Sequence, residues 1–149
     1  MFSLIRTTSD NSDFKNLVAL LDENLKVVDG DEHAFYDQFN KIDAIKHVVV
    51  LYWDGIAAGC GAFKEFNPTT VEIKRMFTLD AYRGKGIASK IVCELEKWAG
   101  ELQYQEAILE TGKKQTAAVA LYQKLHYQPI PNYGQYEHVE NSVCMKKKL

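Results

Sequence analysis

The sequence contains little cysteine or proline and has no strong charge of either sign. Its 149 residues include three prolines and three cysteines, Cys60, Cys93 and Cys144, which lie far apart in apolar runs. This spacing argues against a disulfide framework or a metal site and predicts three buried thiols in a reducing compartment. The formal net charge is −2. Because that charge provides no global basic field, nucleic-acid binding is not expected, and any anion site must be local.

Long hydrophobic runs are also missing. No apolar stretch approaches the ~20 residues that a membrane helix requires. The first residues, with Arg6 and Asp10 close behind Met1, lack the apolar core of a signal peptide. We therefore expect no membrane association and a cytoplasmic location. The length of 149 residues and the hydrophobic fraction of 46% predict one globular domain over residues 1–149.

The most informative stretch is a glycine-rich turn over residues 82–89, which follows a strand-like run and precedes a helical pattern. Such a turn leaves backbone N–H groups unpaired at the start of the helix and predicts an anion site suited to phosphate. Gly84 and Gly86 let the main chain approach the anion, while Arg83 and Lys85 add positive charge. An ordinary solvated turn is the alternative. The spacing fits neither a P-loop nor a dinucleotide fingerprint.

Hydrophobic periodicity predicts the remaining elements. Alternating or β-branched runs predict strands, and apolar residues three or four positions apart predict helices. The expected strands are 2–7, 47–53, 56–66, 70–78, 105–110 and 142–145. The expected helices are 11–28, a second one carrying Phe35, Tyr36 and Phe39, one over 87–100 and one through 117–125. The order of strand, helix, strand and helix from residue 70 onward predicts a parallel strand pair, and Lys146, Lys147 and Lys148 are interpreted as a solubilising tail.

Two motifs resemble those of one enzyme family. Arg83-x-x-Gly86-x-Ala88, between a strand and a helix, resembles the coenzyme A pyrophosphate loop of the GNAT acyltransferases. Residues 115–127 are similar to the family's Asn-x-x-Ala-x-x-Leu-Tyr-x-Lys-x-Gly-Phe helix. The resemblance implies an α/β (α+β) GNAT fold with a mixed, mostly antiparallel sheet of six to seven strands, about four helices and a central parallel strand pair.

The resemblance also implies a coenzyme site. The backbone of Met76, Phe77 and Thr78 would pair with the pantetheine arm like an added strand. The pyrophosphate would be held by Arg83, Gly84, Lys85, Gly86, Ile87 and Ala88, with Ser89 close by. Gln115 stands where the family has an asparagine that contacts the coenzyme. His126 replaces the family's glycine, which is costly if its φ angle is positive.

Two side chains are candidates for catalysis. Glu72 matches by position a glutamate that serves some family members as the general base, with Glu110 as the second choice; the alternative is that Glu72 only pairs with Lys74 or Arg75. A base is needed because an amine with a pKa near ~10 is protonated at neutral pH. Tyr122 matches the tyrosine that protonates the departing thiolate, and its alternative role is core packing.

The resemblance implies an N-acetyltransferase that moves an acetyl group from acetyl-CoA to a primary amine of a small molecule or peptide, by direct attack in a ternary complex and without a metal. A homodimer is consistent with it, because many relatives pair. A non-catalytic acyl-CoA-binding sensor and a nucleotide-phosphate binder are the alternatives. Tyr127, Tyr133 and Tyr136 lie close in sequence to Glu137 and Glu140. If these residues line the acceptor site, their aromatic and acidic side chains form a wall that favours a cationic acceptor.

Overall fold

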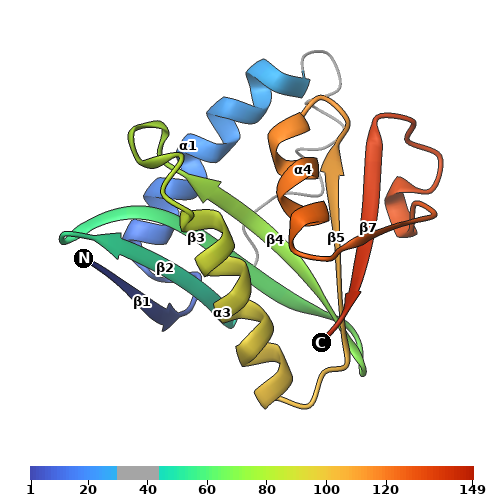
Figure 1. Cartoon of the computed structure of the whole chain (residues 1–149), viewed down its shortest axis with the longest axis horizontal. Helices are drawn as coiled ribbons and strands as arrows, with labels where there is room; N and C mark the ends of the chain where they lie inside the picture. The colour runs from blue at the N-terminus through green and yellow to red at the C-terminus, as the bar shows by residue number, and fades with distance from the viewer. Residues whose placement is uncertain (30–43) are drawn as a thin grey trace.

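The computed structural model describes residues 1–29 and 44–149, and these form a seven-stranded mixed sheet flanked by helices (Figure 1). The strand order is β1-β2-β3-β4-β5-β7-β6. The strands are β1 (Phe2–Thr7), β2 (His47–Trp53), β3 (Ile56–Asn67), β4 (Thr70–Thr78), β5 (Glu106–Gly112), β6 (Gln128–Ile130) and β7 (Ser142–Lys148). The α-helices described are α1 (Ser12–Asp29), α3 (Ile87–Glu101) and α4 (Thr116–Lys124). The helix predicted to carry Phe35, Tyr36 and Phe39 lies outside the described residues.

The central parallel pair predicted from the sequence is β4 and β5, and the other neighbouring strands in the described sheet are antiparallel. Helices cover both faces of this sheet. In β2, Val48 and Val50 belong to the core that α1 covers, whereas Val49 and Leu51 belong to the core beneath α3 and α4. This alternation is the period of two that a strand buried on both faces requires. The three-layer arrangement confirms the predicted fold class.

β3 lies directly beneath α3 because two of its residues have no side chain. A Cβ atom on Gly59 would lie 2.8 Å from Ile87 Cγ2, and one on Gly61 would lie 2.8 Å from Ile91 Cγ2. Real Cβ atoms do not approach so closely, so the two glycines are what allow α3 to pack at this distance.

β4 carries a bulge that ends its pairing with β5. Arg75 has a φ angle of 62°, and the register with β3 shifts where Arg75 and Met76 oppose a single residue. Pairing with β5 stops at Ile73, opposite Leu109. Figure 1 shows β4 and β5 starting side by side and then diverging toward the top of the view. The bulge bends and twists the strand, so the middle of the sheet opens there.

Three observations concern the remaining sequence predictions. Cys60 and Cys144 are buried as expected, but Cys93 is exposed, because it lies on the outer side of α3. Lys146, Lys147 and Lys148 are not a free tail: they belong to β7 and pair with β5. Within residues 1–29 and 44–149, no helix is long and apolar enough to cross a membrane.

The end of α4 contains a strained residue. His126, which stands where the related motif has glycine, has a φ angle of 76°. Its backbone N–H donates to the Gln123 carbonyl at 3.1 Å, and that of Tyr127 donates to the Tyr122 carbonyl at 2.9 Å, so this conformation closes the helix. A residue with a Cβ atom pays about 1 kcal/mol or more to adopt the left-handed region.

We predict that His126→Gly stabilises the protein by about 1 kcal/mol, because glycine adopts the left-handed conformation without a steric cost. For a chain of this size the melting temperature should rise by about 2–4 °C, measured by calorimetry. Ala120→Gly, in the middle of α4, is the matched control and should lower stability by about 1 kcal/mol. An unchanged or lower melting temperature for His126→Gly would show that the His126 side chain offsets its backbone strain.

Candidate functional site

A cavity of about 600 Å³ lies where β4 and β5 separate. Because the sheet is open there, the cavity reaches both faces: Leu21 and Asn24 of α1 line one side, and Ala118 and Leu121 of α4 line the other. The predicted site residues that line it are Glu72, Met76, Phe77, Thr78, Arg83, Gly84, Gly86, Ile87, Ala88, Ser89, Glu110, Gln115 and Tyr122. The fold thus gathers the predicted site residues, which come from four separate segments of the chain, around one space.

The glycine-rich turn ends the cavity at the start of α3. Gly84 and Gly86 have φ angles of 83° and 75°, which favour glycine. Among the described residues, the backbone N–H groups of residues 84–89 donate no hydrogen bond within the protein, and the first to donate is that of Lys90, to the Gly86 carbonyl. The first turn of α3 contains no acidic residue. The open amides and the positive end of the helix dipole are therefore suited to an anion.

The two cations of the turn point in different directions. Arg83 lines the cavity and is half exposed, and its nearest described carboxylate is Asp80, at 3.2 Å on the surface. Lys85 does not line the cavity: its ammonium lies 5.3 Å from the centre of the Trp53 ring, a cation–π contact. Arg83 is therefore placed to add charge beside the open amides, whereas the charge of Lys85 is directed toward Trp53.

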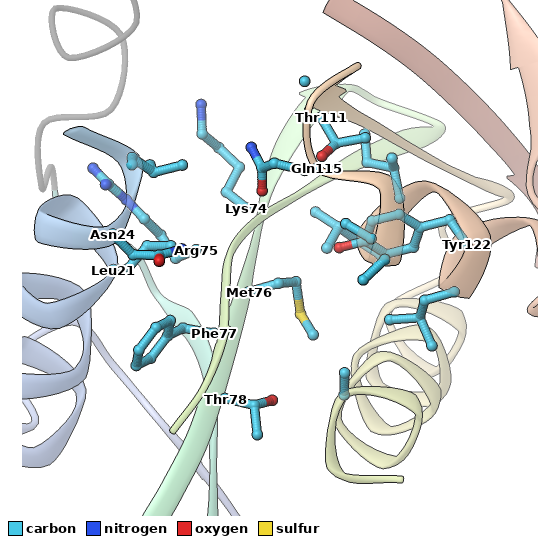
Figure 2. Close-up of a pocket in the computed structure, with 18 of the residues that line it drawn as sticks. Leu21, Asn24, Lys74, Arg75, Met76, Phe77, Thr78, Thr111, Gln115 and Tyr122 are labelled. Carbon is cyan, nitrogen blue, oxygen red and sulfur yellow. The ribbon is translucent and has the colours of Figure 1, made fainter. Parts of the chain in front are cut away.

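The edge of β4 that faces β5 is free beyond the bulge. Phe77 and Thr78 pair on their other side with Cys60 and Gly59 of β3, Met76 lies in the bulge, and the pairing of β4 with β5 has already ended. In Figure 2, Met76 and Thr78 point toward α3 and α4, whereas Phe77 points toward α1. Gln115, which precedes α4, also points into this gap. An extended ligand can use this edge as it would use a neighbouring strand.

Tyr122 projects from α4 into the opening. The residue is only 6% exposed, and Figure 2 shows its hydroxyl pointing toward β4. Burial raises the pKa of Tyr122, so the hydroxyl keeps its proton at neutral pH. Tyr122 also packs edge-to-face on Tyr127, with ring centres 5.7 Å apart. Its two predicted roles, core packing and proton donation, are therefore compatible.

Glu72 lies on the opposite side of the opening and is held by two neighbours. Its Oε2 atom accepts a hydrogen bond of 2.6 Å from the Tyr133 hydroxyl, and its Oε1 atom lies 3.8 Å from Lys74 Nζ. The predicted ion pair with Lys74 is therefore present, but it is long, and the Glu72 side chain is only 14% exposed. Arg75 lies instead 3.7 Å from Asp22 of α1.

The second carboxylate, Glu110, comes from β5. It accepts a hydrogen bond of 2.7 Å from the Ser142 hydroxyl, so it is anchored to β7. Of the predicted acceptor wall, Tyr136 lines the cavity and Tyr133 reaches Glu72. Tyr127 bonds to Glu96 elsewhere. Glu137 and Glu140 are exposed and do not line the cavity, so the strongly acidic wall is not formed.

Sequence reasoning missed the contribution of α1 and of Lys114. Leu21, Asn24 and Lys114 line the cavity, but none belongs to a motif that marks it as a site residue. For Lys74 the sequence predicts only an ion pair with Glu72. Among the described residues no cluster of His, Cys, Asp or Glu side chains could hold a metal ion.

Comparison with known proteins agrees with this geometry. The model of the acetyltransferase (GNAT) family matches residues 14–127, which include the glycine-rich turn, both candidate catalytic residues and α4. The chain belongs to the GNAT acetyltransferase family. The matched residues cover more than half of the chain, and the family resemblance of the two motifs is thereby confirmed.

Individual GNAT relatives are moderately similar. The uncharacterized N-acetyltransferase YsnE of Bacillus subtilis (strain 168) is 35% identical over 100 residues, which cover 65% of this chain and 66% of YsnE. The matched stretch thus spans slightly less than two thirds of that relative. A candidate acyl-CoA N-acyltransferase from Klebsiella pneumoniae superposes with a TM-score of 0.81 at 28% identity, covering 100% of this chain and 98% of that one.

A more distant GNAT structure carries a ligand. The acetyltransferase from Elizabethkingia anophelis was solved with acetyl-CoA bound and superposes with a TM-score of 0.69, covering 99% of this chain and 98% of that one. Its identity is only 15%, so it supports the fold alone.

The different directions of Arg83 and Lys85 give a test of the GNAT loop. We predict that Arg83→Ala raises the dissociation constant of coenzyme A about tenfold, because a charge-assisted contact to the diphosphate is lost. Lys85→Ala should change it by less than about threefold, since an exposed charge turned elsewhere contributes little. Titration calorimetry measures both constants. Equal losses in the two variants would contradict the orientation of Lys85, and an unchanged constant for Arg83→Ala would contradict the loop assignment.

Proposed function

We propose that the protein is an acyl-CoA-dependent N-acetyltransferase, which transfers the acetyl group of acetyl-CoA to a primary amine of a small molecule or peptide. The observation that carries this proposal is one continuous cavity that joins the open amides of residues 84–89 to Glu72 and Tyr122. Membership of the GNAT family and relatives named as N-acetyltransferases support it.

The glycine-rich turn fits the diphosphate of coenzyme A. Its N–H groups offer several donors to one anion, and Gly86 opens α3 without a side chain of its own. The free edge of β4 at Met76–Thr78 then accepts the pantetheine arm as an added strand, and Gln115 faces the same arm from the other side. This direction places the thioester at the opening between Glu72 and Tyr122. Acetyl-CoA is thus the cosubstrate.

The reaction begins on the α1 side of the opening. Glu72, directly or through a water molecule, takes a proton from the acceptor ammonium, because only the neutral amine has a lone pair for attack. The nitrogen attacks the thioester carbonyl, the new C–N bond forms, and the C–S bond breaks. Glu110, anchored by Ser142 at 2.7 Å, is the alternative base. Direct attack needs no covalent acyl-enzyme.

The reaction ends on the α4 side. The thiolate of coenzyme A leaves with the electrons of the C–S bond and takes a proton from Tyr122. The acylated nitrogen releases its second proton as the amide forms, and this proton restores the Tyr122 hydroxyl, while Glu72 returns its own proton to solvent. Because burial raises the pKa of Tyr122, its hydroxyl stays protonated where the acceptor amine begins to lose its proton. Acid and base thus lie on opposite sides of the opening in the sheet and do not neutralise each other.

We also propose that residues 1–149 form one acetyltransferase domain in a reducing compartment, the cytoplasm. The first and last strands of the chain belong to the same sheet, and all three cysteines are free thiols.

The experiment that tests the function measures coenzyme A thiol released from acetyl-CoA against a library of amines. An N-acetyltransferase releases thiol at a rate that depends on the acceptor. Release that stays at background with every amine, together with tight coenzyme binding, would identify an acyl-CoA-binding module without turnover.

Tyr122→Phe should lower kcat about 100-fold, because the departing thiolate loses its proton donor, and should leave the dissociation constant of coenzyme A unchanged. Tyr127→Phe is the matched control: Tyr127 is equally buried and packs against Tyr122, but its hydroxyl bonds to Glu96 at 2.8 Å and does not reach the cavity. That variant should lose stability and keep kcat. Steady-state kinetics that show equal kcat values for the two variants would assign Tyr122 to packing alone.

Glu72→Gln should lower kcat/KM about 100-fold at neutral pH, because the amide keeps the size of the side chain and cannot take the proton. The deficit should shrink as the pH rises toward the acceptor pKa of ~10, where the amine is neutral without help. Glu110→Gln, measured over the same pH range, separates the two candidates. If Glu110→Gln shows the pH-dependent deficit and Glu72→Gln does not, the base is Glu110.

A further inference from the structure

Both signs of charge line the part of the cavity next to the end of the β4–β5 pairing. Glu72 and Lys74 lie two residues apart on β4, so their side chains share the face of the sheet that α1 covers. Arg75 follows at the bulge and leans toward α1 in Figure 2. Glu110 follows Leu109, the last residue of β5 that pairs with β4. An acceptor therefore meets carboxylates and cations together.

Lys74 is the cation best placed to bind a ligand. Its side chain is 13% exposed, lines the cavity, and extends between α1 and the segment before α4 in Figure 2. Its ion pair with Glu72, at 3.8 Å, is longer than a charge-assisted hydrogen bond. Glu72 meanwhile has its other oxygen bound to Tyr133 at 2.6 Å. The pair can therefore open without releasing Glu72 from its anchor.

We propose that the acceptor is an amino-acid-like molecule, a primary amine with a carboxylate a few bonds away, and that Lys74 binds the carboxylate. This inference rests on the proposed transferase function. The ammonium of such a molecule binds at Glu72 and its carboxylate binds at Lys74, so two short charge-assisted contacts replace one long ion pair. The span fits because side chains two residues apart on one strand face start only about 6.7 Å apart.

The same arrangement disfavours the polycationic acceptors that an acidic wall would select. The glutamates expected to form that wall, Glu137 and Glu140, are exposed outside the cavity. A diamine bound with one ammonium at Glu72 would bring its second ammonium toward Lys74 and Arg75. Like charges at close range are unfavourable, most of all where little water screens them.

The first test compares matched acceptors with the wild-type enzyme. Each set contains an α-amino acid, its neutral amide, the corresponding amine without a carboxylate, and a diamine of similar length. We expect kcat/KM for the amino acid to exceed that for its amide by about tenfold or more, which is the usual effect of one hydrogen-bonded charge contact. Equal or better use of the amide or the diamine would overturn the proposal.

The second test changes the cation. Lys74→Met, which keeps the length of the side chain, should raise KM for the amino acid about tenfold or more and should affect the amide far less. Lys74→Glu should reverse the preference in favour of the diamine. Lys148→Met is the matched control for net charge, because Lys148 is exposed at the end of β7 and does not line the cavity. If Lys74→Met reduces the use of amino acid and amide equally, the specificity role of Lys74 is wrong.

The design separates this inference from the function on which it rests. If the enzyme acetylates amines that lack a carboxylate and Lys74→Met does not change the rate, the amino-acid-like acceptor is refuted. The proposed transferase function is not affected by that result. Thiol release at background with every acceptor would refute the transferase. In that case calorimetric binding of the amino acid to the protein with coenzyme A, compared between wild type and Lys74→Met, still decides whether Lys74 binds a carboxylate.

Discussion

The end of hydrogen bonding between β4 and β5 is the constraint on which the rest of the structure depends. The two strands pair as far as Ile73 and Leu109, and the bulge at Arg75 then turns β4 away. Strands that separate leave unpaired backbone edges, which are costly in a closed core and useful beside a ligand. The opening joins the two faces of the sheet. Two substrates can therefore approach each other from opposite sides of one layer.

The electrostatics of the cavity follow from this opening. At the α3 end the positive potential comes largely from backbone amides and the helix dipole, so a protein with a net charge of −2 can still bind a diphosphate. On the α1 side the charges are side chains of both signs, carried by Glu72, Lys74 and Arg75 of β4. Tyr122, buried and neutral, lies between these regions. In the reaction that we propose, this arrangement separates the anion site, the proton donor and the acceptor site along one path.

The sequence was sufficient for the elements near the glycine-rich turn and for most of the predicted site residues that the structure brings together around the cavity. Positions such as Gly84, Gly86 and Tyr122 belong to local motifs. Residues of a local motif stay close together in the fold because they are close together in the chain, so their arrangement can be predicted from the sequence. The positive φ angle at His126 could be anticipated for the same reason. The exposure of Cys93, by contrast, depends on which side of α3 packs on the sheet, and an apolar neighbourhood in the sequence does not determine it.

The acceptor side was harder to predict because it is assembled from distant segments. Tyr133 reaches Glu72 across 61 positions, and Asp22 meets Arg75 through the packing of α1 on the sheet. Composition near Tyr136 suggested an acidic wall, but the turn that contains Glu137 directs that side chain to solvent. A charged residue contributes to a site only where the backbone directs its side chain into the cavity.

The glycines beneath α3 have a consequence for how this protein tolerates change. Gly59 and Gly61 set the height of α3 above β3, and the glycine-rich turn leads directly into the first turn of that helix. A single methyl group on either glycine would lift the helix and carry the turn with it. The position of the glycine-rich turn relative to the sheet therefore depends on two residues of β3 that do not line the cavity. A substitution at Gly59 or Gly61 would therefore change the affinity for the coenzyme even when every residue that lines the cavity is unchanged.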